Sequence, residues 1–410
     1  MVRLSSATLC AALVAASAAS AHINHVKRQA SPTSTFTGTL APSVSAIVAT
    51  ISSGEGNPTA TQALYSTAIP GAANPQITNA PPLPDASQIP NSDFPTLDQV
   101  PPTNSPQVQK WIQGIDWSKV PNVTATVDSA SCSGNPTQLA AAGADGNCWW
   151  TCGGCTRDTD ITTCPTKNTW GLSYDDGPSP YTPQLLDYLN EHNLKSTFFV
   201  VGSRVLSRPA MLQLEYEAGH QISVHTWSHN ALTTLTNEQI VAELGWTREV
   251  IRRVIGVTPN TMRPPYGDID DRVRAISNQM GLTPIIWTTA PGGGNYDTND
   301  WKIGAGTVSA AEVVVTFENI IKSAPQLDTG YIVLAHDLYQ QSVELATEVV
   351  LPFALNMTPK QNLMPIVEAL DNRHQVLLGR HVERKGQHHL GRQLDALLVQ
   401  IVRQHNIARV

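Results

Sequence analysis

The chain has 410 residues and a formal net charge of −7, with 41% hydrophobic and 14% charged residues. This composition allows one large domain or two ordinary ones with a sizeable core, and it excludes a wholly disordered or fibrous protein. Because nucleic-acid binding needs a concentrated basic face and the chain is acidic overall, we expect no nucleic-acid partner.

Residues 1–21 have the pattern of a secretory signal peptide. Arg3 precedes an apolar run over residues 7–19, and residues 19–21 (Ala-Ser-Ala) provide the small side chains of a cleavage site. The apolar run is too short and too rich in alanine to span a bilayer, which argues against a membrane anchor. We therefore expect a secreted protein, located outside the cell or in the cell wall.

Residues 22–107 are rich in Ser, Thr, Ala and Pro and contain few aromatic residues. Such a segment cannot bury enough apolar surface to offset its ordering entropy, so we expect a disordered linker. It could be an O-glycosylated stalk through a cell wall or a plain spacer. Residues 108–167 have denser apolar residues and should form a small cap. Asn122 and Asn356 each begin a glycan-acceptor sequence.

The cysteines are concentrated in the cap. Secretion permits disulfides, and removal of the signal peptide leaves Cys132, Cys148, Cys152, Cys155 and Cys164. This odd number predicts two bridges and one free thiol, with a pairing that the sequence leaves open. Residues 152–155 (Cys-Gly-Gly-Cys) could instead be a redox or zinc pair, but no second pair exists to complete a four-cysteine zinc site. We favour structural bridges.

From residue 168 onward, short apolar runs alternate with segments of helical periodicity. The predicted strands cover residues 170–174, 196–201, 221–224, 283–288 and 331–335. The predicted helices cover residues 182–193, 209–218, 237–255, 271–280, 310–323 and 342–355. This alternation is typical of parallel strands joined by helical crossovers, and it predicts an α/β barrel or open sheet.

Candidate catalytic residues follow the predicted strands. Asp175 and Asp176 come after the first strand, His225 after the third and His336 after the last. Ligand sites gather at the carboxyl ends of parallel strands, so these residues can converge on one mouth, and a barrel explains that convergence best. His225 and His229, four residues apart, could bind a divalent metal together with one carboxylate, which leaves the second carboxylate free to act as a base.

Each of these features also has an ordinary structural explanation when it is taken alone. Two aspartates before Gly-Pro usually form a solvated turn, and a histidine at the end of a strand is usually a packing residue. The conjunction is more specific, because the features occur in order and at predicted strand ends. Residues 173–178, 225–229, 263–267, 297–301 and 334–336 resemble the five motifs of the polysaccharide deacetylases of carbohydrate esterase family 4, the NodB-homology domain.

The resemblance covers roughly residues 168–367 and implies a distorted (β/α) barrel with fewer than eight complete units. Ser173 and Tyr174 replace the more usual Thr-Phe of the first motif, which leaves both carboxylates in place. Residues 147–150 (Asn-Cys-Trp-Trp) and 336–341 are similar to the fungal chitin deacetylases within that family. We therefore assign residues 168–370 to a catalytic domain.

The resemblance also implies roles for individual residues. Asp175 would be the general base and His336 the general acid, with Asp176, His225 and His229 as the metal ligands. Zinc fits this ligand set best, and cobalt would also satisfy it.

The remaining motif residues would support the reaction. By resemblance, Arg263 would orient the base, and the backbone N–H of Tyr266 would face the oxyanion. Asp297 would support the catalytic histidine, Trp301 would line the groove, and Leu334 would lie against the acetyl methyl group.

The expected function is that of a secreted, metal-dependent chitin deacetylase that acts on N-acetylglucosamine units in the cell wall and produces chitosan and acetate. The expected partners are chitin, its oligomers and cell-wall polysaccharide, and we expect a monomer. Deacetylation of xylan or peptidoglycan would use the same chemistry. An inactive wall-binding protein or a metal-containing adhesive module on a stalk are alternatives from other classes.

Residues 371–410 do not resemble the family, and they carry seven basic residues against three acidic ones. From Leu390 the apolar residues recur with helical spacing, so a basic amphipathic helix could lie on a membrane or on acidic wall polymer. We favour the simpler interpretation of a poorly ordered extension. Because no long apolar tail is seen, we expect no glycolipid anchor, and membrane attachment by other means stays open.

Overall fold

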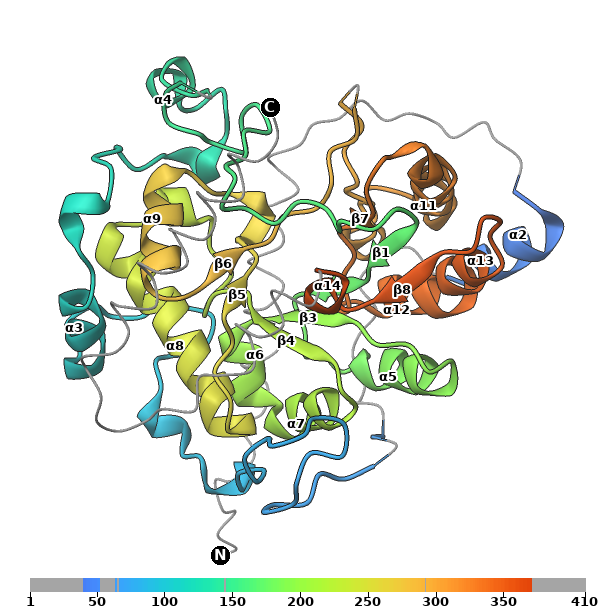
Figure 1. The fold of residues 1–410 in the computed structure, drawn as a ribbon, viewed down its shortest axis with the longest axis horizontal. Helices are drawn as coiled ribbons and strands as arrows, with labels where there is room; N and C mark the ends of the chain where they lie inside the picture. Colours follow the sequence, from blue (N-terminus) through green and yellow to red (C-terminus); the bar gives the residue numbers. More distant parts are fainter. Residues whose placement is uncertain (1–39, 52–62, 65, 144, 292, 371–410) are drawn as a thin grey trace, which may run out of the picture.

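The computed structural model describes residues 40–51, 63–64, 66–143, 145–291 and 293–370 (Figure 1). The expected signal peptide, the first part of the expected linker and the basic tail lie outside the described residues. Within the described part of the chain, no helix has the length and apolar character needed to cross a bilayer.

Short parallel strands form two sheets at the centre of the molecule (Figure 1). The larger sheet contains, in order, β2 (Ser173–Asp175), β3 (Thr197–Val200), β4 (Gln221–Val224), β5 (Thr261–Met262) and β6 (Thr283–Pro284). The smaller sheet contains β7 (Tyr331–Ile332), β1 (Thr169–Gly171) and β8 (Asn362–Met364). Strand β3, with the sequence Thr-Phe-Phe-Val, is buried at every position, as expected for a parallel strand covered on both faces.

Backbone hydrogen bonds join the two sheets into a closed ring. β1 and β2 are separated only by Leu172, so that one extended segment belongs to both sheets. Beyond β2, the Asp175 N–H donates to the Ala335 carbonyl at 2.9 Å. On the other side of the ring, the Thr288 N–H, beyond β6, donates to the Ile332 carbonyl of β7 at 3.0 Å. The prediction of a distorted (β/α) barrel is confirmed.

Helices surround this barrel, with α8 and α9 on the left of Figure 1 and α11 to α13 on the right. α8 begins with a capping box, because the side chains of Thr236 and Gln239 each accept a hydrogen bond from the other's backbone N–H. The barrel helices are α5 (Thr182–Glu191), α6 (Gly202–Ser207), α7 (Pro209–Glu217), α8 (Asn237–Ile255), α9 (Asp271–Gln279), α10 (Trp301–Gly304), α11 (Ala310–Ser323), α12 (Gln340–Leu345), α13 (Leu351–Leu355) and α14 (Ile366–Ala369).

The predicted helices of the barrel are confirmed, with changes at their ends. The single strand predicted over residues 170–174 is divided into β1 and β2, and the other predicted strands are confirmed in shorter or nearly equal form. The expected helix over residues 342–355 is a succession of α12, the π-helix η8 (Ala346–Val350) and α13. Strands β5 and β8 were not predicted. They have only two and three residues, which is too short for a periodic sequence pattern. Only their pairing with neighbouring strands identifies them. The barrel also contains the single 3-10 turns η5 (Leu232–Thr234), η6 (Pro265–Gly267) and η7 (Ala324–Gln326).

The expectation of a disordered linker is wrong for residues 66–107, which we call the N-terminal arm. Leu83 and Phe94 of the arm are buried in the same apolar cluster as the barrel. The side chain of Gln213 on α7 donates to the Pro84 carbonyl at 2.8 Å. The barrel surface thus supplies the burial that the composition of the arm cannot supply by itself. The arm contains η1 (Ala86–Gln88) and η2 (Asn91–Asp93), while α2 (Pro42–Val48) precedes it.

The cap contains both disulfides of the described residues. Cys132 pairs with Cys152, and Cys148 pairs with Cys155, so the Cys-Gly-Gly-Cys residues do not pair with each other. Cys164 is a buried free thiol, and burial raises its pKa to about 12. The prediction of two bridges and one free thiol is confirmed. The cap elements are α3 (Pro106–Gln113), η3 (Trp117–Lys119), η4 (Asp128–Ala130) and α4 (Pro136–Ala140).

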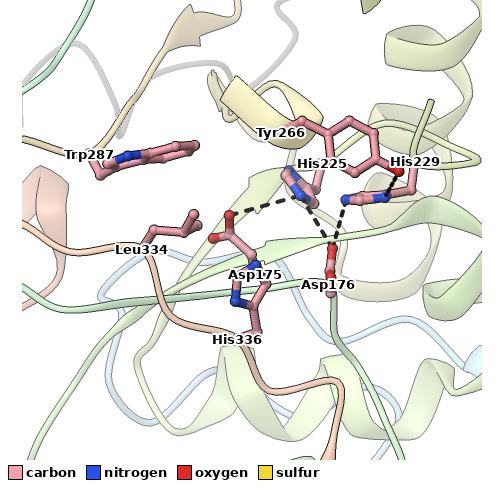
Figure 2. Close-up of a pocket in the computed structure, with 8 residues that line it drawn as sticks. All are labelled: Asp175, Asp176, His225, His229, Tyr266, Trp287, Leu334 and His336. Atoms are coloured by element: carbon pink, nitrogen blue, oxygen red, sulfur yellow. Dashed lines mark hydrogen bonds and ion pairs between the residues drawn. The ribbon is translucent and has the colours of Figure 1, made fainter. Parts of the chain in front are cut away.

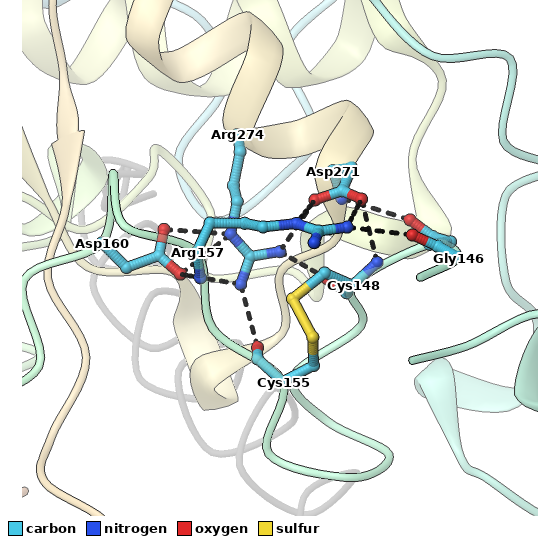
Figure 3. Close-up of a disulfide and its surroundings, with 8 residues drawn as sticks. Gly146, Cys148, Cys155, Arg157, Asp160, Asp271 and Arg274 are labelled. Carbon is cyan, nitrogen blue, oxygen red and sulfur yellow. Dashed lines mark hydrogen bonds and ion pairs between the residues drawn. A yellow bond between two sulfur atoms is a disulfide. The ribbon is translucent and has the colours of Figure 1, made fainter. Parts of the chain in front are cut away.

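One buried and one partly exposed ion pair attach the cap to α9 beside the Cys148–Cys155 bridge (Figure 3). Arg274 of α9 lies 2.9 Å from Asp160, and both side chains are almost completely buried. Arg157 lies 2.6 Å from Asp271 at the beginning of α9. Arg274 also donates to the carbonyls of both bridged cysteines. The cap is therefore joined to the barrel through charges as well as through apolar contacts.

We predict that Arg274→Ala lowers the free energy of unfolding by about 3–5 kcal/mol, because it leaves the carboxylate of Asp160 buried without its counter-charge. Urea unfolding followed by circular dichroism measures this loss. Arg252→Ala, which breaks a more exposed pair with Glu249, is the control and should cost about 0–1 kcal/mol. Equal losses of unfolding free energy in the two variants would show that the buried pair stabilises the protein no more than the exposed pair does.

Candidate active site

The candidate active site is a pocket at the carboxyl ends of the barrel strands (Figure 2). Asp175 is the last residue of β2, His225 directly follows β4, and His336 lies beyond β7. The structure therefore brings together side chains that follow separate strands in the sequence. The residues that line the pocket are Asp175, Asp176, His225, His229, Tyr266, Trp287, Leu334 and His336.

Three of these side chains have potential metal-ligand atoms that lie close together. Asp176 Oδ1 lies 3.0 Å from His229 Nε2 and 3.4 Å from His225 Nε2. One ligand atom from each residue lies within 4.8 Å of the other two, and all three residues are buried. Two imidazole nitrogens and one carboxylate oxygen are a donor set used by catalytic zinc and by other divalent transition metals. The residues present fit such an ion.

The second nitrogen of each histidine has a partner that orients the ring. His225 Nδ1 lies 2.8 Å from the Arg263 carbonyl oxygen, which can only accept, so Nδ1 carries the proton and the lone pair of Nε2 is available to bind a metal ion. His229 Nδ1 lies 3.2 Å from the Tyr266 hydroxyl (Figure 2). Partners of this kind hold metal-binding histidines in the required tautomer and orientation.

The turn that contains Asp176 is shaped by close neighbours. Asp176 has a φ of 80°, in the left-handed region that non-glycine residues seldom adopt. The guanidinium of Arg204 donates to the Asp176 carbonyl at 2.6 Å. A Cβ at the next residue, Gly177, would overlap the buried carboxylate of Asp337. Burial raises the pKa of Asp337 to about 7, although a hydrogen bond from Thr182 opposes this rise.

Asp175 is paired with a buried arginine. Arg263 Nη1 lies 2.7 Å from Asp175 Oδ1, and the two side chains are 0% and 2% exposed. The guanidinium lies 4.0 Å from the centroid of the Phe199 ring. Burial lowers the pKa of Arg263, whereas the charge of Asp175 raises it. The pair holds the carboxylate of Asp175 in one orientation beside the three potential metal ligands.

His336 lies beside Asp175, with which it forms a parallel β-bridge. Its Nδ1 is 2.6 Å from Asp300 Oδ1, and its backbone N–H donates to Asp300 Oδ2 at 2.8 Å. Burial by itself lowers the pKa of His336, but Asp300, Asp176 and Asp175 outweigh this effect and raise the pKa to about 10. These three carboxylates therefore favour the protonated imidazole, the form that can donate a proton.

Comparisons with known proteins agree with this geometry. Residues 162–285 match the family model described as polysaccharide deacetylase. "Chitin deacetylase 1" of Cryptococcus neoformans var. grubii is 62% identical over 305 residues, which are 73% of this chain and 63% of that protein. "Chitin deacetylase 2" of Saccharomyces cerevisiae is 34% identical over 237 residues, which are 57% of this chain and 67% of that protein. The chain belongs to the polysaccharide deacetylase family.

One similar solved structure is the chitin deacetylase from the fungal pathogen Colletotrichum lindemuthianum. It is 26% identical, with a TM-score of 0.46, and the match covers 57% of this chain and 97% of that one. The sequence matches confirm the resemblance to the family. This chain spans 63% of the length of the Cryptococcus relative.

The structure corrects one residue of the fourth family motif. Asp297 was expected to support His336, but its side chain accepts from the Asn299 N–H at 2.9 Å, and Asp300 is the hydrogen-bond partner of the imidazole. The motif contains an aspartate at both positions. Which of them meets the histidine depends on the intervening turn, where Asn299 has a φ of 59°.

The tryptophan that lines the pocket is also different from the one expected. Trp301 is 2% exposed at the beginning of α10 and is not among the pocket residues, whereas Trp287 lines the pocket. Trp150 of the cap packs edge to face on Trp287, with 4.7 Å between ring centroids. Trp287 lies near the end of a predicted strand, so the strand-end rule could have identified it. Tyr266 and Leu334 also line the pocket.

We predict that Asp300→Asn lowers the pKa of His336 by about 1–3 pH units, because it removes an adjacent negative charge and leaves the opposing effect of burial in place. NMR titration of the imidazole in the metal-free protein measures this change. Asp297→Asn is the control and should change the pKa of His336 less. If Asp297→Asn lowered the pKa of His336 more than Asp300→Asn does, Asp297 would be the aspartate that supports His336.

Proposed function

We propose that the protein is a secreted, divalent-metal-dependent deacetylase that hydrolyses the N-acetyl groups of N-acetylglucosamine units in chitin. The observation that carries this proposal is the proximity of three elements in one pocket. These are the potential metal ligands Asp176, His225 and His229, the carboxylate of Asp175 paired with Arg263, and the imidazole of His336. The chitin deacetylases of Cryptococcus and Saccharomyces to which the chain is similar support chitin as the substrate.

Asp176, His225 and His229 would hold the ion, and we propose zinc, with cobalt as a substitute that the same donors accept. When bound, the ion would supply Lewis-acid chemistry, polarising the acetamide carbonyl and making a water molecule more acidic. The hydrogen bonds from His225 Nδ1 to the Arg263 carbonyl and between His229 Nδ1 and the Tyr266 hydroxyl would orient the two rings toward it.

The residues of the chain would divide the proton transfers between them. Asp175, oriented by Arg263, would accept a proton from the attacking water as the water oxygen bonds to the carbonyl carbon. The backbone N–H of Tyr266 would donate to the oxyanion that forms. The C–N bond would then break as His336 gives its proton to the nitrogen, which releases acetate and the free amine of the sugar.

The surroundings of each group suit this division. Arg263 lies against the carboxylate of Asp175, and Asp300 favours the protonated form of His336. A base and an acid act at one pH when one group is able to accept a proton and the other carries one. Leu334 and Trp287 give the pocket an apolar wall that suits the methyl group of an acetyl substituent.

A location outside the cell or in the cell wall forms part of the proposal. The bridges Cys132–Cys152 and Cys148–Cys155 suit an oxidising compartment. Asn122 and Thr124 are exposed, so the acceptor sequence there is accessible to glycosylation. Asn356 is also exposed, but its side chain donates to the Pro352 carbonyl at 2.8 Å, which makes it the poorer acceptor.

Acetate release from chitin oligomers tests this function. We predict that a chelator abolishes the release and that added zinc restores it. Asp176→Ala should lose metal and activity together. Asp175→Asn should keep the metal, because it removes the base and no ligand, and should slow turnover by about 100- to 10,000-fold.

Asp187→Asn, at an exposed carboxylate on α5, is the control and should leave metal content and turnover unchanged. Near-normal turnover of Asp175→Asn would show that Asp175 is not the base. Release of acetate from acetylated xylan or peptidoglycan, but not from chitin oligomers, would show that chitin is not the substrate. The proposed deacetylation chemistry would still stand. Absence of release from every substrate would favour a wall-binding protein.

A further inference from the structure

The segment that contains both metal-binding histidines needs support from outside itself. We call residues 225–229 the histidine loop. Within it, Thr226 has a φ of 64° and His229 a φ of 57°, both in the left-handed region that non-glycine residues seldom adopt. Backbone of this kind persists only where the surrounding structure holds it in place. The contacts that hold the histidine loop therefore affect the geometry of the metal site.

A carboxylate on α8 provides the first support. The N–H groups of Trp227 and Ser228 both donate to Glu243 Oε2, at 2.7 and 2.9 Å, and the Ser228 hydroxyl donates to Glu243 Oε1. Glu243 is completely buried. These hydrogen bonds fix the backbone between the two histidines.

Helix α6 provides a second support from another direction. The backbone N–H and the hydroxyl of Ser203 donate to the Trp227 carbonyl, at 3.1 and 2.6 Å. The Gly202 N–H donates to the Thr226 carbonyl at 2.9 Å. A Cβ at Gly202 would lie 2.6 Å from the Trp227 ring, so a glycine is needed for the indole to fit.

The third support comes from the N-terminal arm, more than a hundred residues away in the sequence. The Trp227 indole Nε1–H donates to the Thr96 carbonyl at 3.0 Å, across a sequence separation of 131. Phe94 stacks on the Trp227 ring with a centroid distance of 6.0 Å and an interplanar angle of 5°. The Asp98 N–H donates at 2.9 Å to the Ser203 hydroxyl, the same group that binds the Trp227 carbonyl. The arm thus closes the pocket in which Trp227 is completely buried.

The arm is itself attached to α8 at this point. Arg253 of α8 lies 2.6 Å from Asp93, and its guanidinium lies 5.1 Å from the centroid of the Phe94 ring. Phe94 also packs edge to face on Trp246 of α8, with 5.8 Å between centroids. Residues 94–98 are therefore held in a defined position against the histidine loop.

We propose that residues 94–98 of the N-terminal arm are a positioning element of the metal site, which act through Trp227 to hold His225 and His229 in a metal-binding arrangement. The inference rests on the metal site of the proposed function and deepens it. The family match begins at residue 162, so this support comes from outside the matched region. Ligands that are already oriented lose less conformational freedom when an ion binds, and removal of outer partners weakens metal binding.

Metal affinity of the full chain tests the inference. Phe94→Ala removes the ring stacked on Trp227, and Trp227→Phe removes the indole N–H while it keeps an aromatic ring. Zinc is titrated into each metal-free protein in competition with a chromophoric chelator. We predict that the zinc dissociation constant rises about tenfold in each variant. Saturating zinc should then restore most of the deacetylase activity.

Leu83→Ala is the matched control, because it also removes a buried apolar side chain from the arm, away from the histidine loop. It should lower the thermal unfolding temperature and leave the zinc dissociation constant unchanged. If Phe94→Ala does not fold, Trp227→Phe decides the matter.

Unchanged zinc affinity in the Trp227→Phe and Phe94→Ala proteins would overturn the inference while the proposed metal site stands. An equal loss of zinc affinity in Leu83→Ala would also overturn it, because the arm would then act through stability alone. Unchanged zinc affinity in Asp176→Ala would instead overturn the proposed site itself. The two failures are therefore distinguishable.

Discussion

The buried ion pair between Asp175 and Arg263 is the interaction on which the rest of the site depends. A carboxylate removed from water needs a cation or hydrogen-bond donors to compensate for the hydration that its charge has lost. Arg263 provides that cation at 2.7 Å. The carbonyl of the same residue accepts from His225 Nδ1, so one residue of the third family motif orients both the proposed base and a proposed metal ligand.

Closure of the barrel places a protonated group next to this carboxylate. The segment after β7 returns alongside β2, and the parallel bridge between Asp175 and His336 makes them neighbours. Asp300 accompanies His336 and raises its pKa against the effect of burial. The carboxyl group of Asp175 and the imidazole of His336 therefore share one mouth of the barrel, an arrangement that suits a proton acceptor beside a proton donor.

Segments outside the matched region complete the surroundings of the pocket. The cap supplies Trp150, which packs on the pocket residue Trp287, and disulfides and ion pairs hold the cap in place. The N-terminal arm supplies the contacts of Phe94 and Thr96 with Trp227, between the two histidines. A barrel with fewer than eight units has less wall of its own, and these segments cover parts of it.

The sequence alone determined the class of fold, the five motifs, the potential metal ligands and the count of disulfides, because these depend on local spacing, alternation and composition. Tertiary structure alone decided that Asp300 meets His336, that Trp287 lines the pocket and which cysteines pair. It also decided that the arm is ordered. Each of these depends on what a distant part of the chain presents: a turn conformation selects one of two aspartates, and the barrel surface supplies the burial that a proline-rich segment cannot supply to itself.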